Sequence, residues 1–168
     1  SALQYYGMFD QLTGKIISVS LRKFKTVSLN NTEYSFIKTK EKLFFGQQEV
    51  ILDNRTVQIA TAEKALIDIV NFRKSKYAID LVIEKLIEHK HNLELALMAE
   101  YLKEFSIATI KTFGFVFDLL NIDSVSIYRL AEHSIKIKHS NHKMLAGDKK
   151  FNAKWRLYYD EYFDKYAK

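Results

Sequence analysis

Two patterns of apolar and polar residues divide the chain. Between residues 15 and 60 the two kinds alternate; Ile17, Val19 and Leu21, for example, fall on one face of a predicted strand. A period of two is typical of half-buried strands. After Thr61 the apolar residues recur every three to four positions, which predicts amphipathic helices. Strands followed by helices predict an α+β fold.

Short polar turns predict hairpins in the strand-rich part. Asn30-Asn31 separates predicted strands at Thr26–Leu29 and Glu33–Lys38, and residues 53–55 separate Glu49–Leu52 from Thr56–Ala60. Asn and Asp tolerate the left-handed backbone of tight turns. Because hairpin-length turns join only antiparallel strands, we expect a mostly antiparallel N-terminal sheet.

The helical part is expected to pack on this sheet as a bundle. Helices are predicted after Thr61, around Ile79–Ile87, at about 93–105, near 107–120, and from Ser124 or Ser126 to beyond Ala131. Thr61, Asn92, Ser106 and either Ser124 or Ser126 are the predicted caps. Residues 1–9 are typical of a helix end closed by Gly7 and a turn from Asp10 to Gly14, and residues 136–150 of a loop. Phe151–Tyr159 alternates again, so we expect a late strand that returns to the N-terminal sheet, with Trp155 as a core anchor.

The chain contains no proline and no linker rich in Gly or Ser. We therefore interpret residues 1–168 as a single domain: a strand-rich part (1–61), a helical part (62–148), and a closing strand and tail (149–168). The chain has no cysteine, which suits a reducing cytoplasm. No apolar run approaches the roughly 18 residues that a membrane span needs, so no membrane association is predicted.

The formal net charge of +6 is unevenly distributed. Between residues 133 and 156 the only acidic residue is Asp148, whereas basic residues are frequent. Such a stretch is typical of a surface for an anionic partner, either DNA or an acidic protein face, although a solvated lysine-rich surface is the plain alternative. The candidate surface residues are Lys136, Lys138, Lys143, Lys149, Lys150 and Arg156, with Arg22, Lys23 and Lys25 from the early strands.

The sequence offers no convincing catalytic pattern. A nuclease of the restriction-endonuclease type needs an Asp and a Glu-x-Lys on adjacent strands. The one Glu-x-Lys, Glu88-His89-Lys90, falls at the end of a predicted helix, and Asp148-Lys149-Lys150 falls in a predicted loop. The spacing of the histidines does not favour a metal. We predict no enzyme activity, no catalytic or metal site, and no cofactor.

Four segments, taken in order, resemble one known family. They are residues 1–10 (SALQYYGMFD), 57–70 (VQIATAEKALIDIV), 114–120 (GFVFDLL) and 152–158 (NAKWRLY). This ordered set resembles the AbiEi-type antitoxins, the transcriptional-regulator half of type IV (abortive-infection) toxin–antitoxin systems. In that family the first segment directly follows an N-terminal winged helix-turn-helix, so we expect this chain to be the C-terminal domain without it.

The resemblance implies an antitoxin domain that counteracts a nucleotidyltransferase-like toxin, with or without a stable complex. It also implies that the preceding winged helix-turn-helix binds operator DNA and represses the shared operon. An alternative remains open: a catalytically inactive, restriction-endonuclease-like module that assists DNA binding. Composition and periodicity alone predict only a non-catalytic α+β domain with a basic C-terminal stretch.

Overall fold

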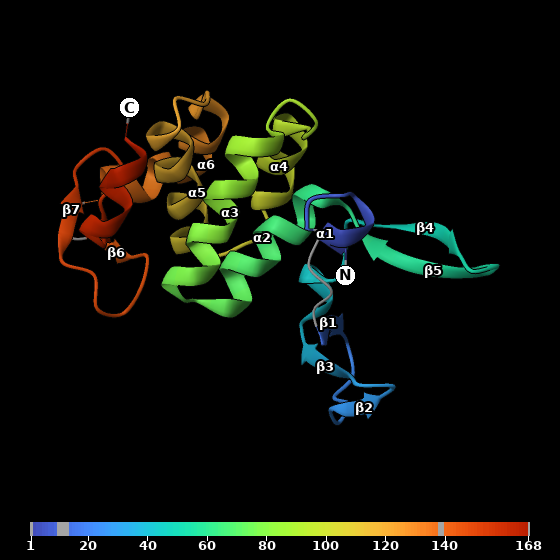
Figure 1. Cartoon of the computed structure of the whole chain (residues 1–168). Helices are drawn as coiled ribbons and strands as arrows, with labels where there is room; N and C mark the ends of the chain where they lie inside the picture. Colours follow the sequence, from blue (N-terminus) through green and yellow to red (C-terminus); the bar gives the residue numbers. More distant parts are fainter. Residues whose placement is uncertain (1, 10–13, 138–139, 168) are drawn as a thin grey trace. The chain divides into compact units, whose positions relative to one another are not determined.

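The computed structural model describes residues 2–9, 14–137 and 140–167, and it has the predicted α+β fold (Figure 1). The chain divides into two compact units, residues 1–65 and 66–168. Within the described ranges, no helix is both long and apolar enough to cross a membrane.

The first unit consists mainly of strands joined by tight turns. Its elements are α1 (Ala2–Tyr5), β1 (Lys15–Ser20), β2 (Val27–Leu29), β3 (Thr32–Lys38), the 3-10 helix η1 (Glu41–Leu43), β4 (Gln47–Leu52) and β5 (Arg55–Ala60). Both predicted hairpins are confirmed: β2 pairs with β3, and β4 with β5, each antiparallel. Asn30 and Asn31 have φ values of 48° and 59°, as do Asp53 and Asn54, which is the left-handed conformation expected of these turns.

One strand pairing in this unit is parallel. β1 runs parallel to β3, with Lys15 opposite Glu33, so the sheet order is β1-β3-β2. The extended segment between β1 and β2 makes this possible, because it is long enough for the chain to cross before the hairpin begins. The expected end of the first helix at Gly7 is confirmed by its φ of 66°, whereas the turn expected at Asp10 lies outside the described residues.

Five helices follow the strands. They are α2 (Ala62–Arg73), α3 (Lys76–His89), α4 (Leu95–Leu102), α5 (Ile107–Leu119) and α6 (Val125–Lys136). The hydroxyls of Thr61 and Ser106 accept the backbone N–H of Lys64 and Thr109, as predicted for helix caps. From Thr109 to Phe117 every residue of α5 is buried, so this helix lies inside its unit.

The structure differs from the sequence prediction at the N-terminal caps of two helices. The prediction that Asn92 caps a helix is wrong: α4 begins at Leu95, and its N-cap, Glu94, makes no side-chain cap bond. Ser124 is the N-cap of α6 but makes no cap bond either, because its hydroxyl donates to Asp118. Asp123 accepts the N–H of Val125 instead.

The late strand does not return to the N-terminal sheet, which corrects the prediction. β6 (His142–Lys143), β7 (Lys150–Asn152) and β8 (Leu157–Tyr159) form a separate sheet in the order β6-β8-β7. Residues 153–156 form a turn, so Phe151–Tyr159 is a hairpin rather than one strand. The Asn152 side chain accepts the N–H of Trp155, and Arg156 has a φ of 49°; together they reverse the chain at the buried indole.

A final 3-10 helix, η2 (Glu161–Tyr166), attaches the C-terminal end to α3. The hydroxyls of Tyr162 and Tyr166 both donate to the carboxylate of Asp80, at 3.0 and 2.6 Å. Lys76, one helical turn before Asp80, forms an ion pair of 2.6 Å with Asp160. Phe163 of η2 is fully buried, so an apolar contact lies beneath these polar ones.

Candidate functional site

One polar site of the second unit centres on the contact between α5 and Trp155. Gly114 and Asp118 lie one turn apart on α5 and therefore on one face of the helix. The indole of Trp155 lies directly on Gly114: a β-carbon at this position would be 2.1 Å from the nearest ring carbon. Glycine is needed here for close approach, since any larger residue would overlap the ring.

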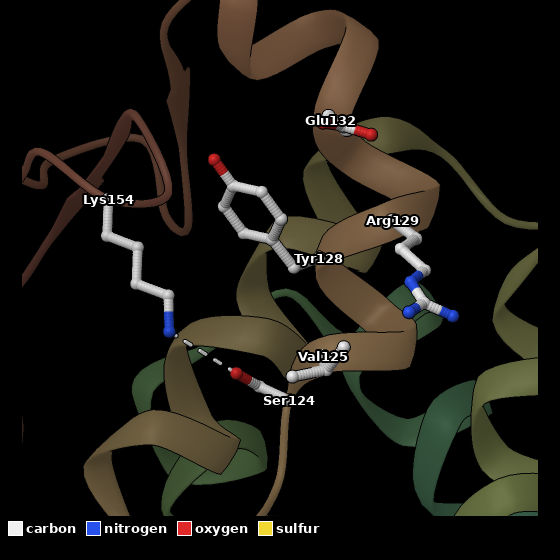
Figure 2. Close-up of a pocket in the computed structure, with 6 residues that line it drawn as sticks. All are labelled: Ser124, Val125, Tyr128, Arg129, Glu132 and Lys154. Atoms are coloured by element: carbon white, nitrogen blue, oxygen red, sulfur yellow. Dashed lines mark hydrogen bonds between the residues drawn. The ribbon is translucent and has the colours of Figure 1, made fainter.

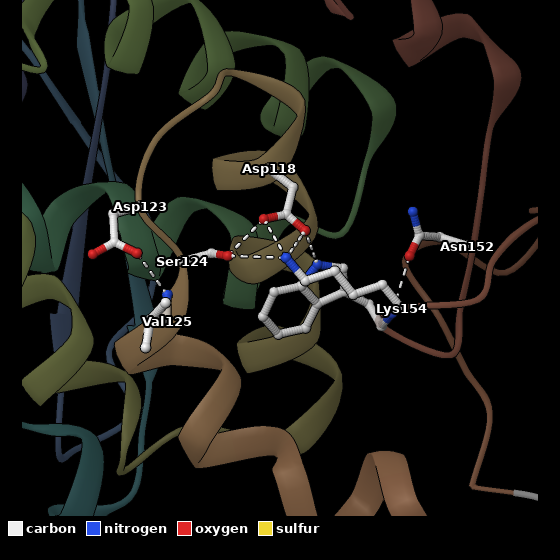
Figure 3. A network of polar contacts seen from close by, with 7 residues as sticks. Asp118, Asp123, Ser124, Val125, Asn152 and Lys154 are labelled. Carbon is white, nitrogen blue, oxygen red and sulfur yellow. Dashed lines mark hydrogen bonds and ion pairs between the residues drawn. The ribbon is translucent and has the colours of Figure 1, made fainter.

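The carboxylate of Asp118 holds this contact in place (Figure 3). One oxygen accepts the hydroxyl of Ser124 at 2.5 Å, and the other accepts the indole N–H of Trp155 at 2.7 Å. The ammonium of Lys154 contacts both oxygens, at 2.8 and 2.7 Å. These contacts occupy the acceptor positions of the carboxylate, so Asp118 serves as a structural anchor rather than as a base or a metal ligand.

A pocket of about 390 Å³ lies beside this anchor (Figure 2). It is lined by Ser124, Val125, Tyr128, Arg129, Glu132 and Lys154, and we call it the α6 groove. Four of these residues follow the spacing of one helical face of α6, and Lys154 comes from the turn between β7 and β8. The ring of Tyr128 meets Trp155 edge-on at 5.5 Å, so the buried indole supports the groove wall.

The charged residues of the groove differ in their partners. Lys154 pairs with Asp118, and Glu132 pairs with Lys136 at 2.6 Å. The pairing with Lys136, together with the charge of Arg129, lowers the pKa of Glu132. Arg129 is exposed, and its guanidinium makes no hydrogen bond within the described ranges. The groove therefore offers apolar contact at Val125 and Tyr128 beside an available guanidinium, which suits binding of a carboxylate-bearing group.

The predicted basic surface carries charges of both signs. Lys136 pairs with Glu132 and Lys150 with Asp164, while Arg156 donates to the side-chain oxygen of Asn141 at 3.0 Å. Lys143 lies 5.9 Å from the centre of the Tyr158 ring, and Lys149 is exposed. Lys138 lies outside the described residues. Carboxylates next to Lys136 and Lys150 weaken the uniform positive field that a phosphate backbone requires.

The other candidate basic residues lie in the first unit. Arg22, Lys23 and Lys25 are exposed in the segment between β1 and β2. Phe24, between them, is 52% exposed and contacts Phe36 with ring centres 5.3 Å apart. The segment therefore presents an aromatic ring among three basic side chains.

Sequence reasoning missed the role of Asp118 and one buried lysine. Gly114 and Asp118 belong to one of the four segments that carry the resemblance, but the sequence does not show that they contact Trp155. Lys111 occupies a buried position in the same helix, with its side chain removed from solvent. Asp148 is also buried, and burial raises its pKa; it accepts the N–H of Leu145 at 2.7 Å and so closes a turn.

A search of the described residues finds no group of three or more His, Cys, Asp or Glu side chains that could hold a metal ion. Comparison of the chain with protein-family models, with curated proteins and with solved structures finds no match.

Proposed function

We propose that this chain is the antitoxin domain of a transcriptional regulator of the AbiEi type, and that it counteracts a nucleotidyltransferase-like toxin. In the full protein, a winged helix-turn-helix ahead of this domain would bind operator DNA. The protein would act in the cytoplasm as a binding protein without catalytic activity.

The observation that carries the proposal is a contact between two of the segments on which the resemblance rests. Gly114 and Asp118 belong to the segment that is similar to the family's Gly-aromatic-Leu-Leu-Glu helix, with Asp118 at the acidic position. Trp155 belongs to the segment that is similar to its closing Trp-containing strand. The indole lies on the glycine and donates to the acid. Each of these three residue types thus has a physical role that depends on the other two, which favours a shared structure over a chance likeness.

The distribution of charge favours a protein partner over DNA. Lys136, Lys150 and Lys154 each pair with a carboxylate, so they offer little net positive charge to a phosphate backbone. The α6 groove combines an available guanidinium at Arg129 with apolar surface at Val125 and Tyr128. Such a combination fits an acidic side chain on a folded protein surface, and we assign the toxin contact to this groove.

The test is rescue of growth. The domain is expressed together with the toxin encoded beside it in the genome, and colony formation is measured. We expect rescue by the unchanged chain, loss of rescue with Arg129→Glu, and full rescue with Lys103→Glu. The last variant makes the same change of charge at an exposed ion pair on α4, so it controls for net charge.

The alternative function is distinguished by a mobility-shift assay with duplex DNA. A DNA-binding module would shift DNA with an affinity that falls steeply as salt rises. Failure of the unchanged domain to rescue, together with such a shift, would replace the antitoxin proposal by the inactive nuclease-like one. Rescue that persists with Arg129→Glu would instead leave the antitoxin function standing and remove the groove as its contact surface.

A further inference from the structure

Lys111 is a buried cation that faces other basic groups rather than an acid. Its side chain is removed from solvent, and its ammonium donates to the backbone carbonyl of Ser140 at 2.8 Å. The next polar atom is Nδ1 of His142, at 3.1 Å. No ion pair within the described ranges includes Lys111. Burial, and then the nearby charge of Arg156, lower the pKa of Lys111 to about 8.

With Lys111 charged, the contact fits a neutral His142. For the ammonium of Lys111 to donate to Nδ1, that nitrogen must carry a lone pair, so the imidazole proton lies on Nε2. A second proton on the ring would place an N–H on Nδ1, facing the ammonium at 3.1 Å. Lys111 and His142 would then compete for one acceptor, the carbonyl of Ser140. Protonation therefore replaces a hydrogen bond by repulsion between two cations.

Within the described ranges, no acidic group contributes to the pKa of either member of this pair. Burial, and then the charge of Lys111, lower the pKa of His142, while a backbone hydrogen bond with Ser140 raises it. Arg156, from the turn before β8, is a further cation near Lys111, and its guanidinium donates to Asn141. From α6, the hydroxyl of Ser134 forms a hydrogen bond of 2.6 Å with the hydroxyl of Ser140, and this contact carries no charge.

The segment held by Lys111 leads directly into β6. The N–H of His142 donates to the carbonyl of Arg156 at 3.0 Å, and the N–H of Met144 to that of Tyr158 at 2.9 Å. β6 is an edge strand of two residues, so its pairing with β8 is short. Lys111 of α5 and the buried side chain of Met144 add further attachments to this short strand.

We propose that Lys111 and His142 form a pH-operated clamp: neutral His142 keeps residues 140–144 on α5, and protonated His142 releases them while the helices stay folded. The direction follows from linkage. The pKa of His142 is below its ordinary value of 6.5 when the segment is held and returns toward that value when it is released. Protons therefore bind more tightly to the released form, and the released fraction rises as the pH falls below about 6.5. This clamp does not rest on the proposed antitoxin function.

Amide hydrogen exchange measured by NMR on the whole chain tests the clamp. Protection factors, corrected for the intrinsic pH dependence of exchange, are compared between pH 8 and pH 5. We expect protection of the Met144 amide to fall between these pH values, by up to about tenfold for each unit by which the pKa of His142 lies below 6.5. Amides of α5, such as that of Val116, should keep their protection over the same range. The pKa of His142 is read from its imidazole signals in the same samples.

Two variants remove opposite halves of the clamp. His142→Phe cannot be protonated, so protection of Met144 should become independent of pH between 5 and 7, where Lys111 stays charged. Lys111→Met removes the facing cation but not the burial, so the pKa of His142 should rise part of the way toward 6.5 and the acid release of the segment should become smaller. His133→Gln and His139→Gln remove the two nearest histidines in the sequence and should leave the transition unchanged.

Several results would overturn the clamp. One is a pKa of 6.5 or above for His142 in the folded chain. Another is constant protection of Met144 between pH 8 and 5. A third is an acid transition of unchanged size in Lys111→Met, which remains informative even if His142→Phe fails to fold. Loss of protection in α5 together with Met144 would show general acid unfolding rather than local release.

Discussion

The ring of Trp155 occupies the space that a side chain at Gly114 would fill. Three ring carbons lie between 2.1 and 2.4 Å from the position of a β-carbon on Gly114. Glycine normally costs a helix interior stability, roughly 0.5–1 kcal/mol relative to alanine. Here the cost is offset, because the missing side chain lets an aromatic ring reach the helix backbone and lets its N–H reach Asp118.

Gly114→Ala is expected to destabilise the protein by about 1–3 kcal/mol, since overpacking of the indole outweighs the better helix propensity of alanine. The informative control is the same change in a Trp155→Ala background. With the ring gone, Gly114→Ala should become neutral or stabilising, by up to about 1 kcal/mol. Chemical denaturation of the four proteins measures this double-mutant cycle, and equal effects in both backgrounds would mean that the two residues do not touch.

Trp155→Ala is expected to lower the free energy of unfolding by about 3–5 kcal/mol, because a fully buried ring is removed. As the single Trp of the chain, it also reports its own burial. The emission maximum of the folded protein should be blue-shifted relative to free Trp in water and should move to longer wavelength on unfolding. Emission like that of free Trp in the folded state would contradict the buried position.

Asp118→Ala and Lys154→Met remove opposite ends of one ion pair but should have unequal effects. Without Asp118, the indole N–H and the Ser124 hydroxyl lose their acceptor in a buried place, at a cost of about 1–3 kcal/mol for each unsatisfied group. Without Lys154, Asp118 keeps both of these donors, and the half-exposed ion pair contributes only about 0–1 kcal/mol. Equal thermal shifts for the two variants would argue against Asp118 as the anchor.

The attachment of η2 to α3 should weaken in acid. Burial alone would raise the pKa of Asp80, but hydrogen bonds from Tyr166, Tyr162 and Lys165 together lower it below its ordinary value of 3.8. A carboxylate with a lowered pKa in the folded state contributes stability above its unfolded pKa and loses it as the pH falls through its folded pKa. The free energy of unfolding should therefore decrease as the pH falls below about 4.

Asp80→Asn tests this assignment. The variant should lose about 1–2 kcal/mol at pH 7, because two tyrosine hydroxyls and Lys165 lose a charged acceptor. It should also show a flatter dependence of the melting temperature on pH below 4 than the unchanged chain. Glu100→Gln, at the exposed Lys103 pair on α4, is the matched control and should change neither quantity appreciably.

The sequence by itself determined the local structure of this protein. Alternation and helical spacing depend on neighbouring residues, so the strands before Thr61 and the helices after it were predicted correctly as an α+β fold. The turns at Asn30-Asn31 and Asp53-Asn54 could also be predicted from the residues themselves, because Asn and Asp tolerate the left-handed conformation that a tight hairpin needs. The burial of Trp155 was predicted from the size of its ring and from the alternation of Phe151–Tyr159.

Only the tertiary structure decided which distant segments meet. The pattern of Phe151–Tyr159 is compatible with one strand, but burial of Trp155 over Gly114 turns it into a hairpin that pairs with β6 instead of the early sheet. Ser124 is of a residue type that commonly caps helices, yet its hydroxyl donates to Asp118 instead. Lys111 faces Ser140 and His142 across about thirty residues of chain. Long-range packing and buried hydrogen bonds set these partners, and no short-range pattern in the sequence encodes them.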